Sequence, residues 1–272
     1  MTTTTAGRIT ATQGVGERVR WMVSDTLTIT RRNLTAWART PAFLVFTVVQ
    51  PVMFVLLFRY VFGGAIQTGT PGGYVDYLLP GVIGQTAAFA SIGTAIALAM
   101  ELQKGVIDRF RSMPMARSAV LSGRLAADGA RMLVTILVII GVGYGVGFRF
   151  HNGLPGAVAM VVLAVAFGLT VCAISAFIGL AIKDEESVQA FGMIWMFPLT
   201  FVSSAFVPIA SMPGWMQAFA NNQPFTHIVN ALRAFALGTP LRDDLWIGLL
   251  WLAGLLAVFV PLAVRAYRRA SL

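Results

Sequence analysis

Six long apolar stretches dominate this 272-residue chain and restrict what it can fold into. A helix that crosses a bilayer takes roughly 20 apolar residues, and each stretch is about that long. Only 11% of the residues are charged, against about 25% in a soluble domain. The sequence therefore predicts an all-α integral membrane protein with six transmembrane helices, over residues 42–62, 78–100, 132–148, 156–182, 190–209 and 245–264.

The basic residues are distributed unevenly around these stretches and predict the orientation of the chain. Sixteen of the 20 lie before the first stretch, between the second and third, after the fourth, and at the C-terminus. Because basic residues accumulate on the cytoplasmic side, we expect both termini in the cytoplasm of a multi-pass protein of the cell inner (plasma) membrane. The net charge of +9 reflects this asymmetry rather than binding to nucleic acid.

The first 40 residues are too polar to cross a membrane. Residues 1–16 are rich in Thr and Gly without an apolar period, which is typical of a disordered tail. In residues 17–40, Val19, Val23, Leu27, Leu34 and Trp37 recur at helical spacing, which favours an amphipathic helix along the cytoplasmic interface. A solvated helix that precedes the first span is the alternative. Residues 41–272 then form the six-span domain.

Residues that carry catalysis or nucleotide binding are scarce. Asp, Glu, Lys and His are absent from the centres of the six stretches, and His151 and His227 are far apart in the sequence. Neither lysine follows a glycine, so there is no Walker A sequence. We therefore expect no catalytic residue, no metal site and no nucleotide bound by this chain, and any energy for transport must come from an ion gradient or a partner.

The connection between the second and third stretches contains an unusual segment. Its first part, Val106–Met113, reads VIDRFRSM and is a short amphipathic turn that ends at Pro114. A Phe flanked by arginines suits docking to a protein. A basic loop that only sets topology or binds anionic lipid has a similar composition.

A second unusual segment follows the fifth stretch. Residues 201–208 read FVSSAFVP, and residues 211–238 read SMPGWMQAFANNQPFTHIVNALRAFALG. The Pro and Gly residues interrupt the span and permit two short helices, Trp215–Asn221 and Thr226–Leu237, which are too short to cross a bilayer. We expect these helices to be re-entrant, dipping into the outer leaflet or lying on it.

Both segments resemble those of permease subunits of type 2 ATP-binding-cassette exporters, particularly the daunorubicin/doxorubicin-resistance group. The family tends to have Gly-Thr-x-Glu-Arg where this chain has GVIDR from Gly105 onward, so the acidic-basic pair is kept with a shorter acid. The resemblance implies partners: two copies of a separate ATPase that bind ATP and Mg, and a second permease, identical or a paralogue. It also implies that a coupling helix docks into the ATPase through Val106, Ile107, Asp108, Arg109, Phe110 and Arg111.

By the same resemblance, the first and fifth spans flank a central pathway, and the two short helices cap its exit side. The pathway residues are then Gln50, Met53, Phe54, Met193, Phe197, Thr200, Phe201 and Ser204, and the outer gate is Phe206, Pro208, Pro213, Trp215 and Pro224. Methionines and aromatics suit varied amphiphiles, so the expected substrate is a hydrophobic or amphipathic drug-like compound or lipid. Packing against neighbouring helices or lipid explains the presence of any single pathway residue equally well.

Two other classes of protein compete with the exporter. A membrane-embedded enzyme needs a polar catalytic cluster, and a lipid-recruiting scaffold needs no ATPase.

Overall fold

The computed structural model describes residues 24, 26–35, 39, 41–66, 70, 73–105, 117–241 and 243–269. Within these ranges the chain is helical apart from its connections and contains no strand, which confirms the predicted all-α class. The predicted tail 1–16 and residues 17–23 of the predicted interfacial helix lie outside the described residues. So do the predicted coupling residues Val106, Ile107, Asp108, Arg109, Phe110 and Arg111.

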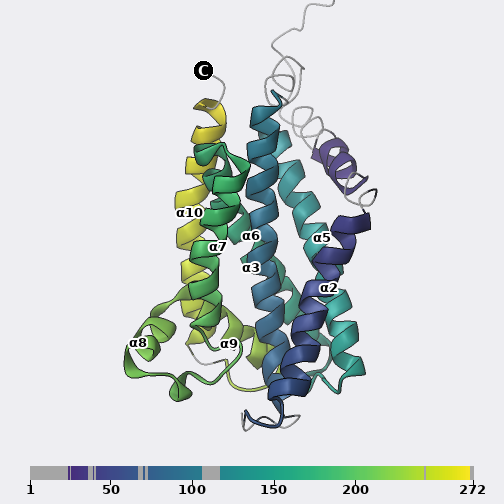
Figure 1. The fold of residues 1–272 in the computed structure, drawn as a ribbon, viewed down its shortest axis with the longest axis vertical. Coiled ribbons are helices and arrows are strands. Elements are labelled where there is room, and N and C mark those ends of the chain that lie inside the picture. Colours follow the sequence, from purple (N-terminus) through teal and green to yellow (C-terminus); the bar gives the residue numbers. More distant parts are fainter. Residues whose placement is uncertain are drawn as a thin grey trace, which may run out of the picture.

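Six helical segments run side by side in an elongated bundle (Figure 1). They are α2 (Pro41–Leu57) with its π-helical continuation η1 (Phe58–Phe62), α3 (Tyr74–Gln103), α5 (Arg117–Gly145), α6 (Gly153–Ile182), α7 (Glu185–Phe201) and α10 (Asp244–Arg269). Among the described residues, four helices are long and apolar enough to cross a membrane, namely α3, α5, α6 and α10. Since α2 and α7 have only 17 residues each, a count of six crossing helices stays a prediction.

The centre of the bundle is the contact between α3 and α6, where small side chains let the two helices approach closely. Ala87, Ser91 and Ala95 lie on a buried face of α3. A Cβ added at Gly179 of α6 would lie 2.3 Å from the carbonyl oxygen of Ala95, so a larger residue would force the helices apart. The hydroxyls of Ser91 and Ser175 are hydrogen-bonded at 2.9 Å across this contact. Close van der Waals packing of this kind holds membrane helices together.

The two ends of the bundle carry different elements. What we call the terminal end, at the top of Figure 1, holds the helical residues 26–35 and the C-terminal end of α10. The opposite α9 end holds the 3-10 turn η2 (Ile209–Ser211), α8 (Gly214–Asn222) and α9 (Pro224–Leu237). α9 is packed into the bundle, whereas α8 leaves Trp215 exposed. Both predicted short helices are therefore present, and their depth in a bilayer stays a prediction.

The helical residues 26–35 pack on the beginning of α5. Ile29 is buried and lies against Gly123, and the Thr30 hydroxyl donates to the carbonyl oxygen of Gly123 at 3.1 Å. Leu27, on the predicted apolar stripe, is 63% exposed. Leu34, on the same stripe, is partly buried and lines a cavity with residues of α3 and α5, whereas Val19, Val23 and Trp37 lie outside the described residues. The placement of the stripe along a membrane interface stays a prediction.

Two helices begin before the apolar stretches that predicted them. α5 begins at Arg117 instead of residue 132, so Asp128 and Arg131 lie inside a helix rather than in a cytoplasmic loop. α7 begins at Glu185, where the Asp184 carboxylate accepts the Ser187 N–H at 2.8 Å as an N-cap. A span predicted from hydropathy ends at charged residues. In α5 an i, i+3 ion pair lets the helix include them, and at α7 an N-cap lets the helix begin beside them.

Candidate functional site

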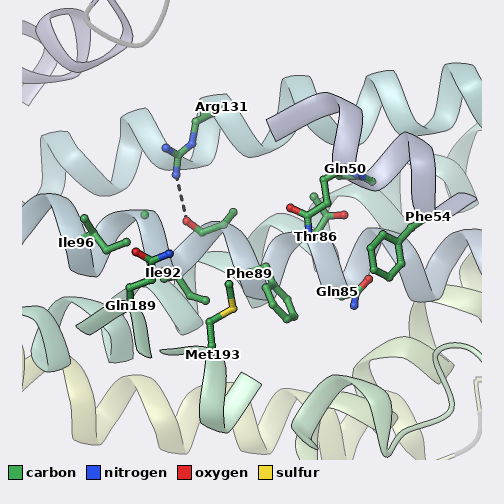
Figure 2. Close-up of a pocket in the computed structure, with 13 residues that line it drawn as sticks. Gln50, Phe54, Gln85, Thr86, Phe89, Ile92, Ile96, Arg131, Gln189 and Met193 are labelled. Atoms are coloured by element: carbon green, nitrogen blue, oxygen red, sulfur yellow. Dashed lines mark hydrogen bonds between the residues drawn. The ribbon is translucent and has the colours of Figure 1, made fainter. Parts of the chain in front are cut away.

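A cavity of about 310 Å³ lies between α2, α3, α5 and α7 (Figure 2). α3 forms one wall, where Ala90 and Gly93 leave space that larger side chains would fill. Along this wall Ile96 lies nearer the terminal end and Gln85 nearer the α9 end, because α3 runs from the α9 end to the terminal end. The lining residues are Gln50, Pro51, Phe54, Gln85, Thr86, Phe89, Ala90, Ile92, Gly93, Ile96, Arg131, Gln189 and Met193.

Three of the eight predicted pathway residues line this cavity: Gln50 and Phe54 of α2 and Met193 of α7. Met53 is 55% exposed and does not line it. The cavity brings residues of α2 and α7 together, as the predicted pathway requires, and adds a wall from α3 that the prediction did not include.

Thr200 and Ser204 are buried but do not line the cavity. The Thr200 hydroxyl donates to the carbonyl oxygen of Met196 at 2.8 Å. The Ser204 hydroxyl donates to the Oδ1 atom of Asn230 at 2.7 Å. Both hydroxyls are therefore satisfied by groups of the protein, and their role in this conformation is to hold the end of α7 and the segment after it.

Phenylalanine rings lead from the cavity toward the α9 end. Phe89 meets Phe197 edge-on, with ring centroids 5.5 Å apart. Phe197 stacks on Phe201 at 5.4 Å, and Phe201 stacks on Phe206 at 5.1 Å. Phe206 in turn stacks on Phe58 at 4.8 Å. We call this set the phenylalanine ladder, formed by Phe54, Phe58, Phe89, Phe197, Phe201 and Phe206.

The five predicted gate residues do not form one cluster. Phe206 is 3% exposed and belongs to the ladder, whereas Trp215 is 73% exposed on α8. Pro208 precedes η2, Pro213 precedes α8, and Pro224 is the first residue of α9. The prolines therefore lie where helices begin, a position that suits their fixed φ angle. Of the five, Phe206 is the one in contact with the ladder.

Arg131 of α5 lines the cavity toward the terminal end. Its Nη2 donates to the carbonyl oxygen of Ala90 at 3.3 Å (Figure 2). The same Nη2 lies 3.0 Å from Asp128 Oδ1, with which it forms an ion pair. The Thr94 hydroxyl donates to the other carboxylate oxygen of Asp128 at 2.7 Å. Both charged residues lie within the apolar helix 122–145. The sequence placed both residues in the loop before residue 132, whereas in the structure they lie inside α5, where each charge has its partner one helical turn away.

A second arginine network closes the α9 end. The Arg233 guanidinium lies over the Tyr77 ring, 3.7 Å from its centroid, and its Nε donates to the Tyr77 carbonyl oxygen at 3.2 Å. Its Nη2 donates to the carbonyl oxygen of Ser204 at 2.7 Å. His227 Nδ1 and Asp244 Oδ1 are 2.6 Å apart and join α9 to α10. These contacts fix α9 against α3, α10 and the segment after α7.

Sequence reasoning missed the residues that α3 and α5 contribute to the cavity. Gln85, Phe89 and Ile96 are spaced by four and seven residues, which places them on one helix face. That spacing is visible in the sequence, but the surrounding stretch is apolar on every face, so periodicity does not single it out. Arg131 has no such signal, because hydropathy assigns it to a loop.

The chain matches the ABC-2 type transporter family over residues 24–237. It is 36% identical over 269 residues to the daunorubicin resistance ABC transporter permease protein DrrB1 of Streptomyces coeruleorubidus, which covers 98% of this chain and 95% of that protein. It is 32% identical over 276 residues to the probable doxorubicin resistance ABC transporter permease protein DrrC of Mycobacterium tuberculosis, which covers 100% and 99%. A more distant relative is the putative transport permease ycf38 of Cyanophora paradoxa, 22% identical over 219 residues, or 78% of this chain and 74% of that protein.

These matches confirm the resemblance inferred from the two loop segments. The family match spans more than half of the chain, and the first two relatives align along almost their whole length. With its long apolar helices, the chain is an integral membrane permease that belongs to the ABC-2 type transporter family.

Proposed function

We propose that this permease is the membrane-spanning subunit of an exporter that moves hydrophobic or amphipathic molecules, either drug-like compounds or lipids, out of the cytoplasm or the inner leaflet. A separate ATPase, present in two copies, binds ATP and Mg and supplies the energy. The permease pairs with a second permease, identical or a paralogue. The full-length relatives named for daunorubicin and doxorubicin resistance support this proposal.

The observation that carries the proposal is the cavity with its phenylalanine ladder. The cavity lies at the lower end of the about 300–1,000 Å³ that small-molecule sites occupy. Phe54, Phe89 and Met193 give it apolar walls, while glutamine amides give it polar groups. The ladder extends from these walls to the α9 end and offers successive aromatic faces to an apolar guest.

The connectivity of α3 and α5 suggests how an ATPase drives this site. α3 ends at Gln103 and α5 begins at Arg117, so the predicted coupling residues lie in the chain that joins two walls of the cavity. Force on this connection would shift α3 and α5 against α2 and α7. Nucleotide would then bias the bundle between two states, one with the cavity open to the terminal end and one open to the α9 end. In this proposal the terminal end is cytoplasmic.

Co-purification and transport test this function together. Tagged permease should capture a P-loop ATPase, and inside-out vesicles that contain both should accumulate the fluorescent amphiphile 11-(dansylamino)undecanoic acid when ATP is added. The double variant F110A/R111A should abolish ATP-driven uptake, because it removes the docking side chains. Arg149→Ala, at the α9 end, is the matched control and should transport normally.

Two results would overturn the proposal. One is a permease that captures no ATPase. The other is unchanged uptake and ATP turnover in F110A/R111A.

A further inference from the structure

Two cavities meet at Arg131. Among the described residues that line the large cavity, Arg131 is the one that carries a charge. A smaller cavity of about 170 Å³ lies toward the terminal end, between the helical residues 26–35, α3 and α5. Asn33, Glu101, Arg124 and Asp128 line this smaller cavity, and Arg131 lines both. The guanidinium is therefore the boundary between a polar space and an apolar one.

The Arg131 side chain is held in place by a carboxylate outside the large cavity and by a backbone carbonyl of its α3 wall. Its side chain is 12% exposed, and its Nη2 is fixed by Asp128 Oδ1 and the Ala90 carbonyl oxygen. Asp128 is itself anchored by the Thr94 hydroxyl at 2.7 Å. Asp128 lines only the smaller cavity. A molecule in the large cavity therefore contacts the Arg131 guanidinium, whose orientation the ion pair fixes, and does not contact the Asp128 carboxylate.

That arrangement selects the chemistry of a ligand. A guanidinium carries only hydrogen-bond donors, so it binds acceptor oxygens and binds charged ones best. In an apolar cavity this attraction is stronger than in water. Ionisable residues inside a membrane are costly and are commonly part of a substrate pathway. Phe54 and Gln85 lie at the opposite side of the site from Arg131 (Figure 2), which leaves the aromatic wall for an apolar body.

We propose that Arg131 binds the anionic, oxygen-bearing head group of an amphiphile whose apolar body lies against Phe89 and Met193. This deepens the proposed function, on which it rests, by naming the substrate class of the same cavity. The volume fits one small apolar body with its head group. The head group belongs either to a free amphiphile from the cytoplasm or to an anionic lipid from the leaflet.

Binding is measured on the purified permease in phosphatidylcholine nanodiscs, without the ATPase. The probe is the fluorescent 11-(dansylamino)undecanoic acid, and its uncharged methyl ester is the comparison. Wild type should bind the acid about tenfold more tightly than the ester, as expected for one charge-assisted contact. Equal affinity for acid and ester, or no binding of the acid, would overturn the proposal.

The variant D128N/R131Q removes the ion pair without leaving a buried charge alone. It should bind acid and ester equally. The matched control is E101Q/R124Q, which neutralises the neighbouring α3–α5 ion pair, 3.0 Å long, whose Arg124 side chain is also 12% exposed but does not line the large cavity. The control should keep the tenfold preference. Loss of the preference in the control as well would overturn the assignment to Arg131.

A second arm identifies the source of the head group. In nanodiscs of phosphatidylglycerol, displacement of the acid supports an anionic lipid at Arg131, and retention of the acid supports a free amphiphile. The proposal and the proposed function fail separately. A permease that prefers the acid but shows no ATP-driven uptake refutes only the exporter. ATP-driven uptake by a permease without the preference refutes only the role of Arg131.

Discussion

Two arginines of this permease, Arg131 and Arg233, lie in different surroundings. Arg131 and Arg233 both lie among packed helices, and both donate to backbone carbonyl oxygens of α3. Arg131 lies beside an open cavity and is paired with a carboxylate. Arg233 lies over the Tyr77 ring and reaches Ser204, and it lines none of the cavities described above.

The difference separates the binding role that we propose for Arg131 from the structural role of Arg233. At the α9 end the guanidinium satisfies the carbonyl oxygen of Ser204, which lies after the end of α7, and so ties that segment to α9. Beside the cavity the guanidinium needs a carboxylate for balance and still faces space. Space beside a charged group, more than the charge itself, marks the site where a ligand can bind. Substitutions at Arg233, Gly81 and Ala90 test this distinction.

The largest effect is expected for Arg233→Ala. The change removes the donors to Tyr77 and Ser204 and the stacking on the Tyr77 ring, and it leaves buried carbonyl oxygens unsatisfied. We expect a loss of about 3 kcal/mol of unfolding free energy. Thermal unfolding of the purified permease in detergent measures it. Arg265→Ala, an exposed position on α10, is the control and should unfold like wild type; a stable R233A would remove the structural role.

An intermediate effect is expected for Gly81→Ala. A Cβ at this position would lie 2.2 Å from the carbonyl oxygen of Ala205, so α3 and the segment after α7 must separate. Overpacking of this kind costs about 2 kcal/mol, which thermal unfolding would detect.

Ala90→Leu on the same helix is the matched change at the cavity. It adds more volume than Gly81→Ala, but it adds it beside open space. We expect unchanged stability and reduced ATP-driven uptake of 11-(dansylamino)undecanoic acid in vesicles. A variant A90L that unfolds as readily as G81A would show that the cavity is no more permissive than the α9 end.

The smallest effect is expected at the exposed start of α7. Hydrogen bonds from the Ser187 side chain and from its backbone N–H hold the pKa of the Asp184 carboxyl below its ordinary value. The cap therefore stabilises the fold above the ordinary pKa of Asp184, and this contribution disappears as the pH falls through the lowered folded-state value. Asp184→Ala should melt slightly earlier than wild type at neutral pH, and the two should melt together in strong acid. Glu185→Ala, which keeps the cap, should melt like wild type at every pH. A difference in melting temperature between Asp184→Ala and wild type that stays constant at every pH would contradict the stabilising role of the ionised cap.

The helices were predictable from the sequence because long apolar stretches and helix breakers are local signals. Such signals together with the family resemblance also pointed to Phe54, which lines the cavity, and to Phe197 and Phe201, which belong to the ladder; their role in a pathway stays a prediction. Arg131 could not be identified from such signals. Its position inside the bundle depends on Asp128 on the same helix and on Thr94 from α3, and only the folded contact brings Thr94 near. A hydropathy scale gives each charged residue the same value wherever it occurs. Whether a charged side chain can be buried depends on the partner that it meets in the folded protein.

The phenylalanine ladder has a kinetic consequence. From Phe89 through Phe197, Phe201 and Phe206 to Phe58, neighbouring rings meet at centroid distances of 4.8 to 5.5 Å, one contact edge-on and three stacked. A flat apolar guest between two rings would replace one ring contact with two of similar strength, so the binding free energy would change little from one position to the next. Under the proposed export function, such a level free-energy profile would let a guest advance in small steps and leave at the far end, because a pathway must bind its cargo weakly enough to release it.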